Sequence, residues 1–326
     1  MRSIAFCNLL VAFALAPGIT ASPVWAQTCE KLSLVVGYSP GGTGDIVASA
    51  ISDALSRKLN KPVVIEPRPG GSGTIAAESV IKAAPDGCTL LVGQTAEIAV
   101  NPVVVKKLGY DPSQDLQPIA LLATVPLALV VAHGAPFGTV MELAEAARAA
   151  KPAMTFASAG RSTPGYFAGE LFRLRSRADL AHVSFDGGGD ALGAVLSGKA
   201  DFYFAALPTA LQDRSKGEIA ILGVSSARRS FAVPEVPTLE ESGFAPFDLD
   251  LCVGLFGPRA VSGSAVIQLN KVINEVLLEP DVRRTMLERG VNIRPMNVAQ
   301  FTSYVAAEMA RYATLIDSEF CATCPW

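Results

Sequence analysis

Short apolar runs alternate with segments of helical periodicity along most of this chain. Residues 32–38 (LSLVVGY) form the first apolar run, and residues 45–59 follow with apolar side chains at helical spacing. Strand-like runs at 61–67 and 89–94 then flank a helical segment at 74–84. This strand–helix order is typical of a parallel sheet covered by helices, so the pattern predicts an α/β fold.

The same alternation starts again after residue 125 and predicts a second α/β unit. Its strand-like runs are 125–132, 154–160, 181–185, 200–206 and 219–226, and its helical segments are 141–150, one from Pro164, and 190–198. A last part of the chain has the strand-like run 249–257 and helical segments near 263–278 and 297–317. These two final helices cannot form a core alone, so we expect them to return to the first unit.

The chain is therefore predicted to form two doubly wound lobes joined by two hinge strands. Lobe 1 comprises residues 27–124 and 251–326, and lobe 2 comprises residues 125–250. The crossings are expected near 124–129 and 247–253. A cleft between two hinged lobes is a common ligand site.

The first 26 residues are typical of an export signal. Arg2 provides a positive start, residues 9–16 (LLVAFALA) are apolar, and Val24-Trp25-Ala26 supplies a cleavage site. A membrane anchor is the alternative, but the apolar run is short and is interrupted by Pro17. We expect a periplasmic protein.

The composition excludes several classes of protein. Lys and Arg number 27 against 30 Asp and Glu, half of the residues are hydrophobic and 17% are charged. Disordered chains have fewer apolar residues and more net charge. Nucleic-acid-binding proteins carry a basic surface, and none is indicated here. We expect a monomer without a cofactor or metal.

Five cysteines remain once Cys7 leaves with the signal. An odd number leaves at least one thiol unpaired in an oxidising compartment, and the sequence leaves the pairing open. The five are Cys29, Cys88, Cys252, Cys321 and Cys324. The last two form a C-x-x-C that is followed by no helix signal, so a tail disulfide or two inert thiols is expected rather than a redox centre.

Two glycine-rich loops stand where a strand signal passes into a helix signal. Residues 37–46 (GYSPGGTGDI) include Asp45 as a natural N-cap, and residues 158–172 (SAGRSTPGYFAGELF) include Thr163 as an N-cap and the positive Arg161. Free N–H groups and the helix dipole favour an anion at such loops. One loop from each lobe predicts a carboxylate site. A tight turn without a ligand is the alternative for each loop.

Two other motifs suggest chemistry less strongly. Gly71-Ser-Gly73-Thr-Ile-Ala76 fits the dinucleotide pattern G-x-G-x-x-A, but the acid expected after it could only be Glu97, in a segment that reads as a loop. A structural turn is the prediction. Ser162 and His182 form a conceivable hydrolase pair, although residues 160–164 lack the last glycine of G-x-S-x-G.

These segments together resemble the substrate-binding proteins of tripartite tricarboxylate transporters, the Bug family. The resemblance runs from about residue 32 to 315 in the family's order. It rests on YSPGGTGDIVA (38–48), EPRPGGSGTIAAESVIKAAPDGCTLLVG (66–93), YDPSQDLQPIALLATVPLALVV (110–131), SAGRSTPGYFAGELF (158–172), HVSFDGGGDALGAVLSGKAD (182–201) and SSARRSFAVPEVPTLEESG (225–243).

The resemblance implies a type II periplasmic-binding fold whose lobes close on a ligand. It implies that the two loops bind one carboxylate through backbone amides and waters, and that three residues on further loops line the far end of the pocket. The loop residues are Tyr38, Ser39, Gly42, Thr43, Gly44, Asp45, Ser158, Ala159, Gly160, Arg161, Ser162 and Thr163, and the far residues are Thr95, Asp186 and Leu207.

One departure from the family pattern bears on the ligand. The family has an aromatic-Lys-Gly where this chain has Phe185-Asp186-Gly187. A negative charge there disfavours a second carboxylate, so the hypothesis is a monocarboxylate or amino-acid-like ligand. The function predicted is capture of a small organic carboxylate for delivery to membrane transporter subunits. The alternatives are a ligand sensor that partners a signalling receptor, and a periplasmic hydrolase.

Overall fold

The computed structural model describes residues 29–320. The predicted signal segment, residues 1–26, and the pair Cys321 and Cys324 lie outside the described residues. Within residues 29–320, no helix is both long and apolar enough to cross a membrane.

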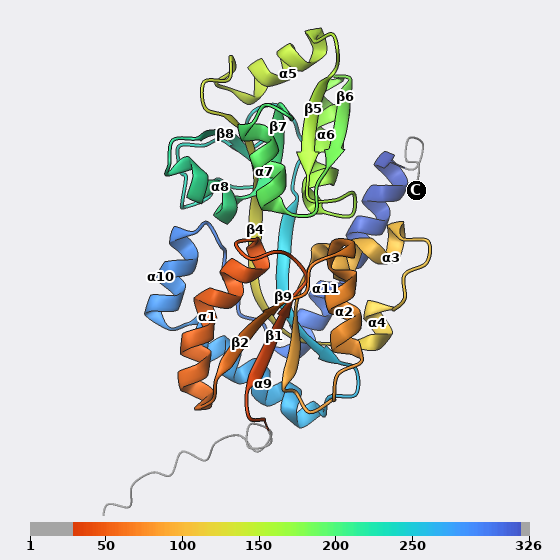
Figure 1. Cartoon of the computed structure of the whole chain (residues 1–326), viewed down its shortest axis with the longest axis vertical. Coiled ribbons are helices and arrows are strands. Elements are labelled where there is room, and N and C mark those ends of the chain that lie inside the picture. The colour runs from red at the N-terminus through yellow and green to blue at the C-terminus, as the bar shows by residue number, and fades with distance from the viewer. Residues whose placement is uncertain (1–28, 321–326) are drawn as a thin grey trace, which may run out of the picture.

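Lobe 1, the lower half of Figure 1, is a twisted sheet with helices on both faces. Its strands lie in the order β2-β1-β3-β9, with the first three parallel and β9 antiparallel to β3. The strands are β1 (Leu32–Val36), β2 (Val63–Pro67), β3 (Thr89–Gln94) and β9 (Asp250–Pro258). The helices are α1 (Thr43–Leu59), α2 (Thr74–Ile81), α3 (Asn101–Val104), α4 (Pro112–Asp115), α9 (Gly263–Leu277) and α10 (Pro280–Glu288), with the short turns η2 (Gly71–Gly73) and η3 (Ala96–Val100).

Lobe 2, the upper half of Figure 1, repeats this architecture. Strand β5 pairs in parallel with both β6 and β7. The strands are β5 (Met154–Ser158), β6 (Leu180–Ser184), β7 (Phe202–Ala206) and β8 (Ile219–Val224). The helices are α5 (Val140–Ala149), α6 (Pro164–Ser176), α7 (Gly188–Leu196) and α8 (Leu207–Arg214).

Strand β4 (Leu116–Ala132) belongs to both lobes. Its first part pairs with β9 as far as Pro126, and its second part, from Leu127, pairs with β7 and β8. Strand β9 starts at the same level, because Asp250 pairs with Pro126. Figure 1 shows β4 and β9 side by side between the lobes. Two adjacent strands thus connect the lobes, as a hinge requires.

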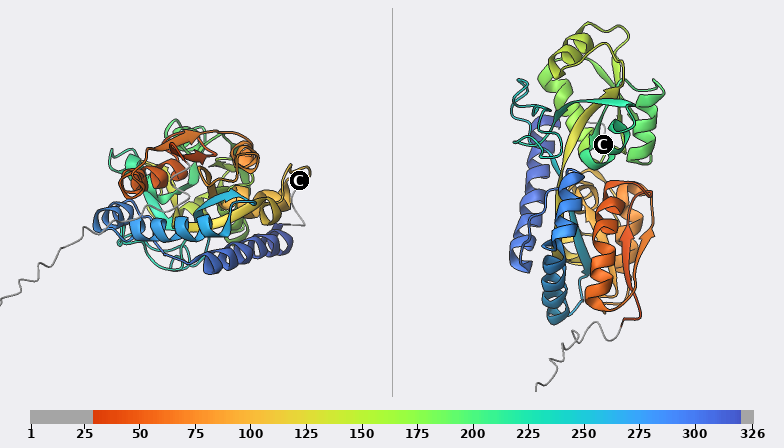
Figure 2. Two further views of the ribbon diagram at one scale, coloured as in Figure 1. Left: turned by 90° about the horizontal axis from the view of Figure 1, so that it is seen from below. Right: turned by 90° about the vertical axis from the view of Figure 1, so that its left-hand side faces the viewer.

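The last long helix, α11 (Val298–Leu315), also contacts both lobes and continues into η4 (Ile316–Phe320). Near its start, Phe301 packs against Phe256 of lobe 1, with 5.3 Å between the ring centroids. Near its end, the fully buried Tyr312 packs against Phe167 of lobe 2 at 5.9 Å. The right-hand view of Figure 2 shows α11 alongside both halves.

Three local expectations from the sequence were wrong. Asp45 is not an N-cap: α1 begins at Thr43 after an extended Gly42, and the Asp45 carboxylate accepts the N–H of Gly41 at 2.8 Å. Leu207 is not in a loop but is the buried first residue of α8. Glu97 lies in the helical turn η3. Helices α8 and α10 were not predicted.

One disulfide joins Cys29 to Cys88. These cysteines precede β1 and β3, which are neighbours in the sheet, and the N–H of Ser33 donates to the carbonyl of Cys88 at 2.8 Å. Cys252 is a buried free thiol in the part of the chain described. The disulfide therefore lies at the amino ends of the lobe 1 strands.

Candidate ligand-binding site

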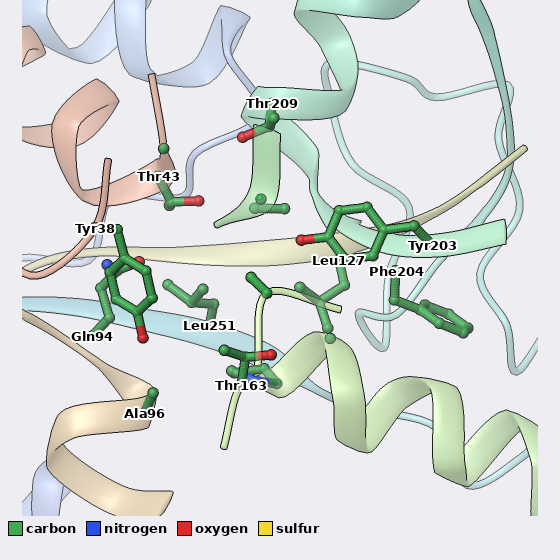
Figure 3. A pocket seen from close by; sticks show the side chains of 16 residues that line it. Tyr38, Thr43, Gln94, Ala96, Leu127, Thr163, Tyr203, Phe204, Thr209 and Leu251 are labelled. Carbon is green, nitrogen blue, oxygen red and sulfur yellow. The ribbon is translucent and has the colours of Figure 1, made fainter. Parts of the chain in front are cut away.

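A cavity lies between the lobes, at the carboxyl ends of β1, β3, β5 and β7 (Figure 3). Open α/β sheets bind ligands at this edge. Its volume is about 60 Å³, which is room for roughly four to six waters. The lining residues are Tyr38, Gly42, Thr43, Gln94, Ala96, Leu127, Ala159, Thr163, Pro164, Gly165, Gly188, Tyr203, Phe204, Ala206, Thr209 and Leu251.

Four helices point their N-termini at this cavity. Pro164 starts α6, as the second loop predicted, and Thr43 starts α1, two residues before Asp45, where the helix was expected to begin. Gly188 starts α7, and Thr209 lies in the first turn of α8. Each N-terminus offers unpaired N–H groups and the positive end of a helix dipole. The backbone therefore gives the cavity a positive potential from both lobes.

None of the described residues that line the cavity carries a charged side chain. Its polar side chains are hydroxyl and amide groups, and Figure 3 shows the Tyr203 hydroxyl directed into the cavity. Burial raises the pKa of Tyr203, so this hydroxyl stays protonated. Gln94 is 5% exposed, and its Nε2 has no hydrogen-bond partner within the described chain. Such an unpaired donor costs stability unless a ligand or water accepts from it.

Of the site residues named from the sequence, the following line the cavity: Tyr38, Gly42, Thr43, Ala159 and Thr163. The others of the two loops surround them. Gly44 packs against Gln94 from within α1, and Ser39 faces Gly187 across the cleft. Ser162 is buried and Arg161 is exposed, and neither lines the cavity.

The far-end residues named from the sequence do not line the cavity. Thr95 accepts the N–H of Cys252 at 2.8 Å and is 2% exposed, so it connects β3 to the hinge strand β9. Leu207 packs on Gly290 of lobe 1: its Cδ2 lies 2.6 Å from where a Cβ on that glycine would stand. Asp186 is exposed and lines a separate groove with Asp190 and Lys199.

The Ser162–His182 pair does not form. His182 Nε2 lies 2.7 Å from the Oγ of Ser158 instead. Burial, with a smaller contribution from Arg161, lowers the pKa of His182 to about 4, so the imidazole is neutral at physiological pH. Ser158 is fully buried and does not line the cavity, so this hydrogen bond orders the 158–163 loop rather than presenting a nucleophile.

Sequence reasoning missed the part of the cavity formed by Gln94, Tyr203, Phe204, Ala206 and Thr209. Gln94 and Ala206 are the last residues of β3 and β7. The rule that ligands lie at the carboxyl ends of parallel strands would have selected both. Tyr203 reads from the sequence only as a core residue of an apolar strand.

The chain is similar to known proteins over most of its length. A family model described as "Tripartite tricarboxylate transporter family receptor" matches residues 47–319. A curated relative from Pseudomonas sp. (strain P51), the UPF0065 protein in the tcbD-tcbE intergenic region, is 32% identical over 290 residues, which cover 87% of this chain and 85% of the relative.

Solved structures show the same fold. MatC from Rhodopseudomonas palustris with bound malate has a TM-score of 0.82 and 29% identity, over 88% of this chain and 98% of that one. A second R. palustris protein, with adipate, has a TM-score of 0.85 and 28% identity, over 88% and 96%. The predicted fold, two α/β lobes of a periplasmic-binding protein, is confirmed.

Proposed function

This chain belongs to the tripartite tricarboxylate transporter receptor family, and from that premise we propose that it captures a small organic carboxylate between its lobes in the periplasm. The closed protein then docks on membrane transporter subunits. Two neighbours of the same fold carry malate and adipate, which supports an organic acid as the ligand.

The observation that carries this proposal is the convergence of four helix N-termini on a cavity lined by uncharged side chains. Backbone amides bind a carboxylate well because they need no reorganisation and carry no counter-ion of their own. The groups come from both lobes, so the ligand completes its contacts only when the lobes are closed. Binding therefore shifts the population toward the closed state.

A narrower proposal concerns the rest of the ligand. Asp186, whose charge led us to expect no second carboxylate, lies outside the cavity. The lining itself supports a neutral remainder, because Leu127 and Leu251 are apolar and the polar side chains of the lining are hydroxyls and one amide. An ammonium group would find no carboxylate to pair with in this lining. We therefore favour a hydroxy- or oxo-substituted monocarboxylate over an amino acid.

The first test is a thermal-shift panel on the mature chain, refolded to strip bound ligand. A ligand at about 100 times its Kd adds roughly 2.7 kcal/mol, which at this length raises the Tm by about 5 °C. 3-Hydroxybutyrate and malate are a matched pair, because they differ by a methyl in place of one carboxylate. We expect the larger shift with the monocarboxylate.

The panel tests carboxylate capture and the neutral remainder of the ligand separately. A larger shift with malate or citrate contradicts the neutral remainder and leaves carboxylate capture standing. No shift with any organic acid contradicts capture itself. Recovery of the acid chemically unchanged after binding distinguishes a receptor from a hydrolase.

Tyr203→Phe tests the side of the cavity that β7 forms. The variant loses one buried hydroxyl that points into the cavity, so the Kd of the acid that gives the largest shift is expected to rise about tenfold. Tyr304→Phe makes the same chemical change on α11, away from the cavity lining, and should leave the Kd unchanged. Equal Kd values for all three proteins, measured by calorimetry, would remove Tyr203 from the site.

A further inference from the structure

The turn after β2 has an unusual backbone. Four consecutive residues have positive φ: Gly70 (126°), Gly71 (57°), Ser72 (51°) and Gly73 (85°). Glycine adopts this region freely, but a serine there costs of order 1 kcal/mol or more. This is the segment that fits the dinucleotide pattern, and carboxylate capture as described above does not use it. Because this backbone conformation is unfavourable for a serine, we expect the position of Ser72 to have a role in the protein.

Ser72 reaches the opposite lobe. Its Oγ lies 2.9 Å from where a Cβ on Gly160 would stand. Gly160 has φ of 118° and sits beside Ala159, which lines the cavity. The turn of lobe 1 therefore touches the 158–163 loop of lobe 2 next to the residue by which that loop lines the cavity.

Two buried side chains support this turn from behind. The Nδ2 of Asn101 donates to the carbonyl of Ser72 at 3.1 Å and to the Oγ1 of Thr74 at 3.3 Å. The side chain of Glu97 packs directly on Gly73, because a Cβ there would lie 2.3 Å from the Glu97 carboxyl carbon. Both Glu97 and Asn101 are fully buried.

Three oxygens of this pair have no hydrogen-bond partner within the described chain: Oε1 and Oε2 of Glu97 and Oδ1 of Asn101. Burial raises the pKa of Glu97 to about 8, so at neutral pH it is a carboxylic acid with one O–H donor. Asn101 follows Glu97 by four residues along a continuous helical stretch, which places both on one face. From that face Glu97 packs on Gly73, and Asn101 donates to Ser72 and Thr74, so the two side chains hold the turn together.

We propose that residues 70–73 complete the closed ligand site by contacting Gly160 across the cleft, and that Glu97 and Asn101 are the positioning residues for this turn. The role of this contact in binding rests on the proposed carboxylate capture, but the contact itself is present without a ligand. The turn thus holds the 158–163 loop in place from the opposite lobe, while residues 70–73 themselves do not line the cavity.

A cysteine cross-link tests the contact independently of any ligand. The double variant Ser72→Cys, Gly160→Cys, with Cys321 and Cys324 changed to Ser, is oxidised mildly and the bond is located by peptide mass mapping. We expect most of the protein to carry a 72–160 disulfide. Ser264→Cys, Gly160→Cys is the control, because Ser264 is exposed at the start of α9, and should give none.

A second cysteine pair serves as a control in case a side chain at Gly160 disturbs folding. Ser72→Cys with Ala159→Cys tests the same contact without a side chain at the positive φ. If both pairs fold by circular dichroism and neither cross-links, with or without organic acids, the contact does not form and the proposal is overturned. This outcome is distinct from failure of carboxylate capture, which the thermal-shift panel reports.

The positioning residues are tested by variants that differ in what they can donate. Asn101→Ala and Glu97→Ala are expected to lower the yield of the 72–160 cross-link severalfold and to weaken binding of the best acid of the panel about tenfold. Glu97→Gln keeps a neutral donor of the same shape and should restore both. Equal yields of the 72–160 cross-link in the parent cysteine pair and in these three variants would contradict the positioning role.

Discussion

Glu97→Gln is expected to remove a loss of stability that the protein undergoes as the pH rises. Burial raises the pKa of the Glu97 carboxyl from 4.5 to about 8. Below pH 4.5 the folded and unfolded chains both carry this proton. Between pH 4.5 and 8 the unfolded chain releases it and the folded chain keeps it, so stability falls by about 1.4 kcal/mol per pH unit. The amide has no proton to release.

The free energy of unfolding of Glu97→Gln minus that of the wild type should therefore increase by about 4 kcal/mol between pH 4.5 and about pH 7.5. Urea unfolding at three pH values in this window measures the free energy of unfolding of both proteins. Glu288→Gln, at the exposed end of α10, makes the same chemical change on the surface and should follow the wild-type profile. A Glu97→Gln profile parallel to the wild type would show that Glu97 is charged in the folded protein.

Removing the disulfide with Cys29→Ser, Cys88→Ser should lower the free energy of unfolding by roughly 4 kcal/mol. The two cysteines are 59 residues apart in sequence, and the loop-closure entropy of a chain segment of that length corresponds to this value. The free energy of unfolding of a domain is only about 5–15 kcal/mol, so the expected loss is a large share of it. Urea unfolding of the oxidised wild type and the double variant measures it.

The same variant should keep its ligand affinity. The disulfide joins the amino ends of neighbouring strands, whereas the cavity lies at the carboxyl ends. A change of less than 1 kcal/mol in unfolding would contradict the chain-entropy account. A large rise in Kd without unfolding would show that the two ends of the sheet are coupled.

The sequence predicted best what local rules determine. Alternating strand and helix signals gave the two-lobed fold, and the glycine-rich loops located Thr43 and Thr163 at the cavity. Both loops carry their own signals, namely glycines at a turn and a helix start. The expected N-cap at Asp45 was wrong for a local reason: an extended glycine, Gly42, caps the helix three residues before the side chain that is the better capping group.

The missed residues depend on how distant segments meet. Gly188 and Thr209 reach the cavity because α7 and α8 start beside it, which the topology of lobe 2 decides. Asp186 and Leu207 follow strands of the same lobe, yet one faces a separate groove and the other packs on Gly290. A shift of one or two residues along a strand end separates these outcomes, and no local pattern encodes it.

Helix α11 has a consequence for the protein as a folding unit. Its first turns belong to the core of lobe 1, whereas Tyr312 near its end, and Ile316 at the start of η4, belong to the core of lobe 2. Together with β4, which is paired on both sides of the hinge, this means that neither lobe has a complete core of its own. The two halves should therefore melt in a single cooperative transition, and an acid bound at their boundary stabilises the entire chain rather than one half of it.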